Sequence, residues 1–531
     1  MQSLYEAFAQ ARAQSPDLFF LALVPSAGDA RWTFEQAGRE VDRLARQYAA
    51  RGWGTGHRVA LGVGNHPRHF FHFLALNSLG ASIVPMNPDH RSAELRYQFM
   101  HAGVQLVVAS AERAGVAREA SAGIEPQVSV IALEDFAALP PAPSHRHFSE
   151  RGLRAEAAVL YTSGTSGLPK GCVLSNAYIL TAGAWYRDLG AALTLRHGEE
   201  RLLNPLPVFH MNCGVTSIAA MCLTHNCLML PERFHASTWW EDCAASGATA
   251  IHYLGVMPPA LVKRESSPLE TAHRIRFGLG AGCEPSLHPV FEARFGFPLI
   301  EVWGMTETGR FIANHREPRS IHTRAFGRAE GALEARVAAE DGQPVPDGQT
   351  GELLVRDTGP DPRRGFFSRY LDDPRATDEA WRGGWFHTGD MVQRDASGML
   401  YFVDRRKDMI RRSGENISAG EVEAVLASHP AVARVAVLPV ADEMRDEEVL
   451  AVVETTAGCA GDADLARGLV AHCLRELAYY KAPAWVAFRA DLPVTPTNKL
   501  QKHRIFAKGE DPRVGAIDLR SLKKRPLHHA S

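Results

Sequence analysis

Lysine is scarce in this 531-residue chain, although basic residues as a class are not. Only nine of the 58 basic residues are lysine, and the rest are arginine. The lysine amine is a compact point charge that fits a crowded cluster of oxygens, which the planar guanidinium of arginine does not. A lysine inside a glycine-rich or loop motif of this sequence is therefore a candidate functional residue.

The eight cysteines form no C-x-x-C pair, and no long apolar run is present. Cys222 and Cys227, with His225 between them, come nearest to a metal-binding pattern, but no second ligand pair follows. This spacing argues against structural zinc and favours reduced thiols in a cytoplasmic protein. The N-terminus lacks a basic segment, and the apolar run 18–24 is too short to cross a bilayer, so neither a signal peptide nor a membrane helix is expected.

The charges nearly balance, with 58 basic against 60 acidic residues and a net charge of −2. This balance argues against a protein whose main task is to bind nucleic acid or an acidic membrane, so we expect neither as a partner. The length exceeds what one core can fill, so two or more domains are expected. The sequence leaves a homodimer open as the assembly.

Strand and helix patterns alternate in the first 150 residues. A helix is expected over 34–51, and apolar strands over 58–64 and 106–110. Such alternation is typical of a parallel sheet covered by helices. From about residue 340 the pattern changes to short strands with turns, for example 351–356 and 398–404.

The segment from 404 onward reads as a small α+β unit. A capping box formed by Ser418 and Glu421 predicts a helix over 422–428, and another helix is expected over 465–477. The expected strands are 432–440 and 485–489. We therefore predict an α/β protein with a large N-terminal domain of helix-covered sheets, 1–403, and a small mobile C-terminal domain, 404–531, with the charged linker 404–408 at its start.

The sharpest motif is YTSGTSGLPKG at 161–171, which follows an apolar strand. Three glycines let backbone N–H groups turn toward an anion, four hydroxyls add donors, and Lys170 adds charge, so the loop is suited to phosphate. The spacing of the P-loop NTPases is absent. A flexible Ser/Gly linker is the alternative, but it explains neither the scarce lysine nor the preceding strand.

Six further blocks follow in order: LPVFH at 206–210, GAGCEP at 280–285, WGMTET at 303–308, GWFHTGD at 384–390, DRRKD at 404–408 with SGENI at 413–417, and PVTPTNK at 493–499. Together with the loop, these blocks resemble the AMP-forming adenylating enzymes, which include acyl-CoA synthetases, peptide-synthetase adenylation domains and luciferases.

The resemblance implies ATP as a substrate, Mg²⁺ as the metal and coenzyme A as the acceptor. It makes Glu307 the Mg²⁺ ligand and places Thr306 at the α-phosphate, the Trp303 ring against adenine, and Asp390 on the ribose with help from Arg405. The family more often has tyrosine where Trp303 stands, and tryptophan lacks that hydroxyl. The implied ATP- and AMP-binding residues are Thr162, Ser163, Gly164, Thr165, Ser166, Gly167, Lys170, Gly282, Cys283, Glu284, Trp303, Gly304, Met305, Thr306, Asp390, Arg405 and Lys499.

Two blocks near the C-terminal domain are implied to serve the second half of the reaction. Lys407 aligns with the hinge about which the small domain rotates. Arg412, Ser413 and Gly414 are implied to contact coenzyme A, with Gly414 lining the tunnel for its pantetheine. The basic run 405–412 could instead bind nucleic acid, but its aspartates and its lack of interleaved aromatics argue against that.

Lys499 is implied to be the catalytic cation, acting with Thr306, Glu307 and His210. When a carboxylate attacks the α-phosphate, negative charge gathers on oxygen, and an ammonium group neutralises it. Asn498 stands where the family usually has glycine, and asparagine tolerates left-handed backbone better than other non-glycine residues. Lys502 is the local competitor for the catalytic role.

His210 is implied to gate and shape the acyl pocket rather than to transfer a proton. No cation other than histidine is evident there, so we expect an acid with an apolar or modestly polar tail. The stretch 411–418 is similar to the branch that contains crotonobetaine/carnitine–CoA ligases. The implied pocket residues are His210, Gly214, Val215, Gly255, Gly280 and Ala281.

The predicted function is an ATP-dependent acyl-CoA ligase of organic or fatty acid metabolism, which forms an acyl-adenylate and then a thioester. One alternative is an enzyme that loads a carrier protein; free coenzyme A is favoured because the chain ends soon after the Lys499 block, with no fused carrier domain. Others are a luciferase-like oxidative use of the adenylate and an inactive nucleotide-binding sensor. Intact Lys170, Glu307, Asp390 and Lys499 argue against the sensor.

Overall fold

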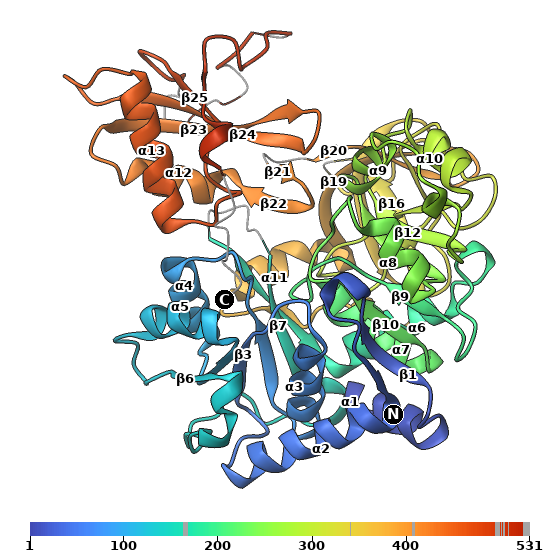
Figure 1. The fold of residues 1–531 in the computed structure, drawn as a ribbon. Helices are drawn as coiled ribbons and strands as arrows, with labels where there is room; N and C mark the ends of the chain where they lie inside the picture. Colours follow the sequence, from blue (N-terminus) through green and yellow to red (C-terminus); the bar gives the residue numbers. More distant parts are fainter. Residues whose placement is uncertain are drawn as a thin grey trace. The chain divides into compact units, whose positions relative to one another are not determined.

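The computed structural model gives the chain as two compact units, each described by itself (Figure 1). The first unit comprises 1–88, 98–161 and 171–406, and the second comprises 89–97, 162–170 and 407–531. The residues that the structure describes are 1–162, 168–339, 341–405, 409–493, 500, 502, 505–507 and 509–523.

An eight-stranded sheet of the first unit runs in the order β14-β13-β12-β11-β9-β10-β1-β2. The six central strands are parallel, and β2 and β14 pair antiparallel at the two edges. In β13, Leu299 and Ile300 pack into two different cores, so both faces of the sheet are covered, as is usual for parallel strands. The strands are β1 (Phe19–Leu23), β2 (Arg31–Thr33), β9 (Arg201–Leu203), β10 (Cys227–Leu230), β11 (Ala250–Leu254), β12 (Phe277–Ala281), β13 (Leu299–Trp303) and β14 (Ile312–Ala313).

A seven-stranded sheet has the order β18-β8-β7-β4-β3-β5-β6, with a parallel run from β7 to β6. The expected helix is confirmed as α2 (Phe34–Ala50), which a capping box at Thr33 and Gln36 begins. It lies beside α3 (Pro67–Ser78) in the blue part of Figure 1. The strands are β3 (Arg58–Gly62), β4 (Ser82–Pro85), β5 (Leu106–Ala109), β6 (Ser129–Ala132), β7 (Glu156–Thr162), β8 (Lys170–Ser175) and β18 (Arg369–Tyr370).

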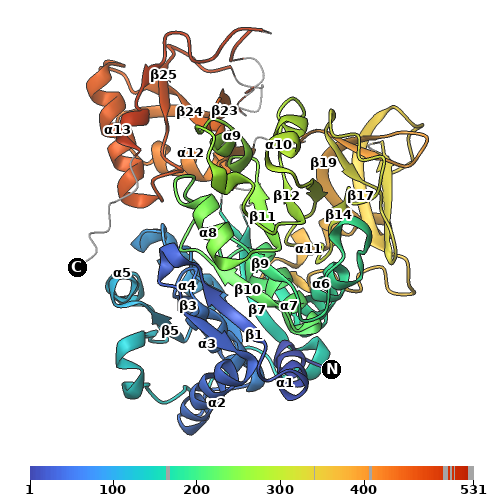
Figure 2. The same ribbon diagram turned by 45° about the vertical axis from the view of Figure 1, so that its right-hand side comes forward.

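The third sheet of the first unit is antiparallel, with the order β15-β20-β19-β17-β16, and Figure 2 shows β17 and β19 next to one another. Its strand β20 continues to Arg405. The prediction that the linker begins at Asp404 is therefore wrong for its first two residues, because they pair with β19. The strands are β15 (Ala325–Gly327), β16 (Leu333–Ala338), β17 (Thr350–Asp357), β19 (Phe386–Arg394) and β20 (Leu400–Arg405).

Helices connect and cover these sheets, and one of them is irregular. Residues Asn212–Ser217 form a turn of π-helix that runs directly into α7 (Ile218–Thr224), and such turns are frequent at functional sites. The other α-helices are α1 (Leu4–Gln14), α4 (Ser92–Ala102), α5 (Ala111–Ser121), α6 (Asn176–Asp188), α8 (Trp239–Ser246), α9 (Met257–Val262), α10 (His288–Phe295) and α11 (Pro374–Ala380). Within the described part of the chain, no helix combines the length and apolar character that a membrane span requires.

The second unit is an α+β fold around one six-stranded sheet with its own apolar core. Its helix α12 begins at Ala419 rather than at the expected 422, because the residues between the two members of the predicted capping box already form the first helical turn. The elements are β21 (Met409–Arg412), β22 (Glu415–Ser418), α12 (Ala419–Ala427), β23 (Val432–Asp442), β24 (Asp446–Thr455), α13 (Ala463–Glu476), β25 (Trp485–Phe488) and β26 (Ile517–Asp518).

Candidate active site

The phosphate-loop motif lies between two neighbouring strands of the seven-stranded sheet. Thr162 ends β7, and Lys170 begins β8. The predicted residues between them, 163–167, lie outside the described residues, as do Lys407, Asn498 and Lys499. Their roles stay predictions.

Trp303 and Asp390 are hydrogen-bonded to each other in the first unit. Trp303 ends β13, and Asp390 lies in β19. The indole Nε1–H donates to Oδ2 of the carboxylate at 2.8 Å, and both side chains are buried. Trp303 therefore offers more than a ring face: it supplies a polar donor that orients the carboxylate predicted to bind ribose.

The turn before Asp390 is fixed by side chains that sequence reasoning missed. The amide of Asp390 donates to Oγ1 of Thr388 at 3.1 Å, and the amide of Gly389 donates to a carboxylate oxygen of Glu352 at 3.0 Å. Gly389 has φ +74°, a left-handed conformation that favours glycine. Asp390 is the register partner of Arg405 across β19 and β20, so the two predicted ribose-binding residues are neighbours in one sheet.

Glu307 is buried and is held by a tyrosine. The hydroxyl of Tyr370 in β18 donates to Oε1 of Glu307 at 2.9 Å. Burial and the nearby carboxylate raise the pKa of Tyr370 far above its usual range, so its hydroxyl remains a neutral donor. Mg²⁺ prefers oxygen ligands such as carboxylates, so the Glu307 carboxylate fits the predicted role as its ligand.

The backbone between Trp303 and Glu307 is fixed from both sides. A Cβ on Gly304 would lie 1.8 Å from the Phe311 ring, so only glycine fits there. The hydroxyl of Tyr178 in α6 donates to the carbonyl of Thr306 at 2.5 Å. Burial raises the pKa of Tyr178, which keeps this donor neutral as well.

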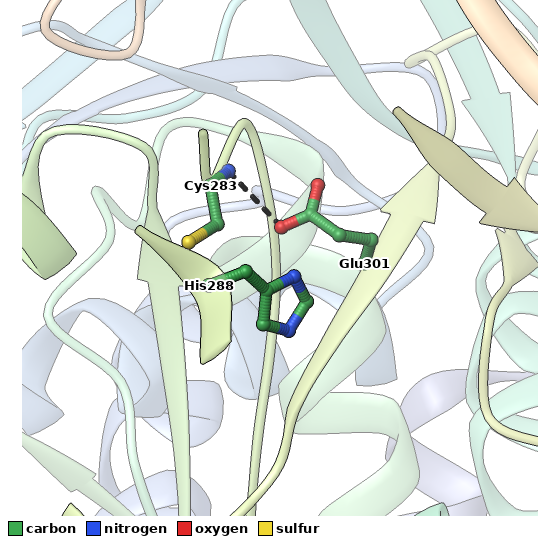
Figure 3. Close-up of side chains that lie close together, drawn as sticks. All are labelled: Cys283, His288 and Glu301. Carbon is green, nitrogen blue, oxygen red and sulfur yellow. Dashed lines mark hydrogen bonds between the residues drawn. The ribbon is translucent and has the colours of Figure 1, made fainter. Parts of the chain in front are cut away.

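The predicted nucleotide residues Gly282 and Cys283 are both bound to Glu301, another residue that sequence reasoning missed. The Gly282 N–H donates to Oε2 at 2.8 Å, and Tyr253 donates its hydroxyl to Oε1. The Cys283 N–H donates to Oε1 at 3.0 Å (Figure 3). The other residues of the strand Leu299–Trp303 are apolar, and a lone carboxylate among them could have marked Glu301 in the sequence as a candidate site residue. The third predicted residue of this segment, Glu284, is exposed and pairs with Arg324 at 3.4 Å.

Cys283, His288 and Glu301 bring a sulfur, a ring nitrogen and a carboxylate oxygen within 4.8 Å of one another (Figure 3). Three donors already engage the Glu301 carboxylate, and His288 Nε2–H donates to Leu299 O and Glu292 Oε1, so this nitrogen carries a proton rather than a lone pair for a cation. Burial and neighbouring carboxylates raise the pKa of the Cys283 thiol, which disfavours the thiolate that binds metals. We interpret this cluster as a support for the loop rather than as a metal site.

Three glycines predicted to line the acyl pocket are close-approach positions. A Cβ on Gly214 would lie 2.0 Å from Val208 O, one on Gly255 2.3 Å from Gly282 O, and one on Gly280 2.1 Å from Tyr253 O. Each of these three Cβ positions therefore faces a backbone carbonyl oxygen rather than open pocket space. Two predicted pocket neighbours, Val215 and Ala281, are buried and partly buried, respectively.

The π-helical turn carries a buried polar network beside the predicted pocket. His252 Nδ1 lies 2.6 Å from Asn212 Oδ1, and its Nε2 lies 3.1 Å from the Tyr186 hydroxyl. Burial lowers the pKa of His252 to about 3, so the ring is neutral at physiological pH. The predicted gate His210 accepts from the Gly214 amide through its carbonyl at 2.9 Å and so fixes the start of this turn.

Of the predicted coenzyme A residues in the second unit, Arg412 is buried and engaged internally. Its Nε donates to Oε1 of Glu448 at 2.7 Å, and the same carboxylate also binds Arg445 and Lys523, at 2.8 and 2.6 Å. Ser413 and Gly414 form the next turn, both with positive φ. Lys502 is also engaged, since its amine contacts Glu423 Oε1 at 2.8 Å and donates to Val437 O at 3.1 Å.

A sequence model of the family described as AMP-binding enzyme matches residues 8–367, and the model of its C-terminal domain matches residues 421–499. The chain belongs to the AMP-binding enzyme family. The resemblance inferred from the motifs and the expected α/β fold class are both confirmed.

Relatives and solved structures agree with the family. A sulfoacetate–CoA ligase of Cupriavidus necator is 34% identical over 510 residues, which is 93% of this chain and 95% of the relative. A crotonobetaine/carnitine–CoA ligase of Citrobacter koseri is 29% identical over 503 residues, 90% of this chain and 93% of the relative. An o-succinylbenzoate CoA synthetase structure from Bacillus subtilis has TM-score 0.82 at 24% identity, covering 95% and 98% of the two chains. The structure of ATP-bound MatB from Rhodopseudomonas palustris has TM-score 0.64 at 25% identity, covering 95% and 98%.

This AMP-binding enzyme is an adenylating enzyme of the acyl-CoA ligase type, as the resemblance implied. ATP and coenzyme A are its cosubstrates and Mg²⁺ its metal, which agrees with the expected cofactors.

The Trp303–Asp390 bond predicts the effect of Trp303→Phe. Phenylalanine keeps an aromatic face but removes the indole donor, so the carboxylate loses the group that orients it. We expect the KM for ATP to rise about tenfold, the effect of one hydrogen bond to a charged group, with little change in the KM for the acid. Trp239→Phe is the matched control, because the buried Trp239 indole N–H has no hydrogen-bond partner in the described part of the chain. Equal effects of the two substitutions on the KM for ATP would contradict this role.

The Glu448 cluster predicts a pH dependence of stability. Burial and the charges of Arg412 and Arg445 lower the pKa of Lys523 to about 7, against the attraction of Glu448. The unfolded chain then binds more protons than the folded one between about pH 7 and the ordinary lysine pKa near 10.4, so the free energy of unfolding rises with pH across this window. We expect melting temperatures of wild type and Lys523→Gln, measured from pH 6.5 to 10, to diverge as the pH rises. Parallel curves would show that the Lys523 pKa is not depressed.

Proposed function

We propose that this protein activates a small carboxylic acid with ATP at the site built from Trp303, Glu307 and Asp390 and transfers the acyl group to coenzyme A. In the first step a carboxylate oxygen attacks the α-phosphorus, the bond to the bridging oxygen breaks, and pyrophosphate leaves. In the second step the thiol of coenzyme A attacks the acyl carbon, loses its proton, and AMP departs.

The observation that carries the proposal is the pair of oriented carboxylates in one unit. Asp390 receives the indole N–H of Trp303, and Glu307 receives the hydroxyl of Tyr370. Both donors are neutral, so neither places a positive charge beside its carboxylate. A ribose with two hydroxyls and a Mg²⁺ ion beside phosphates are ligands that match such groups.

The chain's own residues divide the first step between them. Lys170 and the loop 162–167 would bind phosphate oxygens, Thr306 would contact the α-phosphate, and Glu307 would hold Mg²⁺, which when bound offsets negative charge on the phosphates. Lys499 would neutralise the charge that develops at the reacting oxygens.

We assign the second step to the smaller domain, 407–531, with Lys407 as its hinge. After pyrophosphate departs, rotation about Lys407 would withdraw Lys499 and present the turn at Ser413 and Gly414 to the thiol. Arg412 would serve this step by fixing the turn, since its side chain is bonded to Glu448.

The acid is proposed to carry an apolar or modestly polar tail. The groups beside the predicted pocket that support this are uncharged: the neutral His252, Asn212, and the hydroxyl of Tyr186. A cytoplasmic location is proposed because all eight cysteines are free thiols. The homodimer and the lack of a nucleic-acid partner stay predictions.

Lys499→Ala should lower the rate of acyl-adenylate formation by at least about 100-fold, because no cation then stabilises the developing charge. Thioester formation from preformed acyl-adenylate should be nearly unchanged, since the amine has no part in that step. Both rates are measured by rapid quench and mass spectrometry.

Lys502→Ala is the matched control for Lys499→Ala, since it removes an amine three positions away that is bound to Glu423 and Val437 O. We expect it to affect adenylation by less than about threefold. Unchanged adenylation in Lys499→Ala, or an equal loss in both variants, would overturn the assignment.

An acid panel tests the proposed substrate class. Butyrate, crotonate, crotonobetaine and sulfoacetate are each incubated with ATP, Mg²⁺ and coenzyme A, and acyl-CoA is measured by mass spectrometry. We expect the highest kcat/KM for a tail without a formal charge. A preference for sulfoacetate or crotonobetaine, whose tails are charged, would contradict the class, and adenylate without acyl-CoA would favour transfer to a carrier protein.

A further inference from the structure

Glu301 lies in a register row that crosses three parallel strands. Tyr253 of β11 pairs with Gly280 of β12, and Gly280 pairs with Glu301 of β13. Residues in register on adjacent strands project from the same face of a sheet. The Tyr253 side chain thus has to cross β12 to reach the Glu301 carboxylate, and the two groups are hydrogen-bonded.

Gly280 makes this crossing feasible. A Cβ at Gly280 would lie 2.7 Å from two atoms of the Tyr253 ring, closer than real carbon contacts allow. The glycine therefore leaves the space that the ring occupies. This gives Gly280 a physical role beyond the predicted lining of an acyl pocket.

The Glu301 carboxylate holds the segment Gly282–Glu284 at its start, and other contacts hold it further along. Gly282 and Cys283 donate their N–H groups to the two carboxylate oxygens. The Glu284 carbonyl accepts the N–H groups of Leu287 and His288, at 2.9 and 3.0 Å, where α10 begins. Gly282 has φ +88°, a left-handed conformation that glycine adopts readily and other residues do not.

We propose that Glu301, supported by Tyr253, is the positioning residue that sets the nucleotide-binding segment Gly282–Glu284 for ATP. The inference rests on the proposed function, because that function assigns the segment to the nucleotide. The two successive N–H groups need two acceptor oxygens, and a carboxylate supplies both. Tyr253 limits the rotation of that carboxylate by donating to one of its oxygens.

The bonding pattern predicts a graded series of ATP affinities. Glu301→Ala removes both acceptors, Glu301→Gln keeps one oxygen and turns an NH₂ donor toward the other N–H, and Tyr253→Phe leaves both acceptors in place. We expect the Kd for Mg²⁺·ATP, measured by calorimetry, to rise at least about tenfold for each backbone hydrogen bond lost, so the order is Glu301→Ala, then Glu301→Gln, then Tyr253→Phe.

A control variant separates positioning from general stability. Asp242 on α8 also accepts a backbone N–H and a hydroxyl, both from Ser26, at 3.0 and 2.6 Å. Asp242→Asn, like Glu301→Gln, replaces one of two acceptor oxygens by an NH₂ group, but away from the predicted nucleotide residues. It is expected to lower the melting temperature while the Kd for ATP stays within about twofold.

The outcomes distinguish this inference from the proposed function. Wild-type protein that fails to bind ATP would overturn the proposed function together with the inference. Wild-type binding with a graded loss in the Glu301 and Tyr253 variants supports the inference. Binding unchanged in Glu301→Gln, or weakened in all variants in proportion to their melting temperatures, would overturn the inference and leave the proposed function standing.

Discussion

Three carboxylates of the first unit are each oriented by a neutral aromatic donor, and the proposed chemistry depends on this arrangement. Tyr253 donates to Glu301, Tyr370 to Glu307 and the indole of Trp303 to Asp390. A tyrosine or tryptophan packs its apolar body into the core and still presents a polar atom at the edge. These donors fix the direction of the carboxylates without adding positive charge of their own.

Some of these groups lie at the strand ends of the eight-stranded sheet. Glu301 and Trp303 lie two residues apart at the end of β13, and Gly282, the first residue after β12, lies two residues beyond Gly280, the register partner of Glu301. Ligands commonly bind at the carboxyl ends of parallel strands, where loops and side chains meet. Two glycines make this arrangement possible. A Cβ on Gly255 would collide with the backbone of Gly282, and a Cβ on Gly280 would collide with the Tyr253 ring.

The sequence alone was sufficient for the family, the fold class and most elements, because periodicity and seven ordered motifs carry that information. It located α13 and β23 within a few residues, whereas the start of α12 and the linker at Asp404 needed the hydrogen-bond pattern. Partners distant in sequence, such as Tyr370 for Glu307, were not predictable, since no local pattern marks a contact across 63 residues. The internal engagement of Arg412 and Lys502 was equally hidden, because exposed and buried cations look alike in a sequence.

The central claim is that the acid is activated as an adenylate before coenzyme A takes part. Exchange of labelled pyrophosphate into ATP, measured with wild-type protein, a turned-over acid and Mg²⁺ but without coenzyme A, tests it most directly. We predict acid-dependent exchange, because the first step is reversible and complete without the thiol. An enzyme that forms acyl-CoA yet shows no exchange until coenzyme A is added would contradict the account.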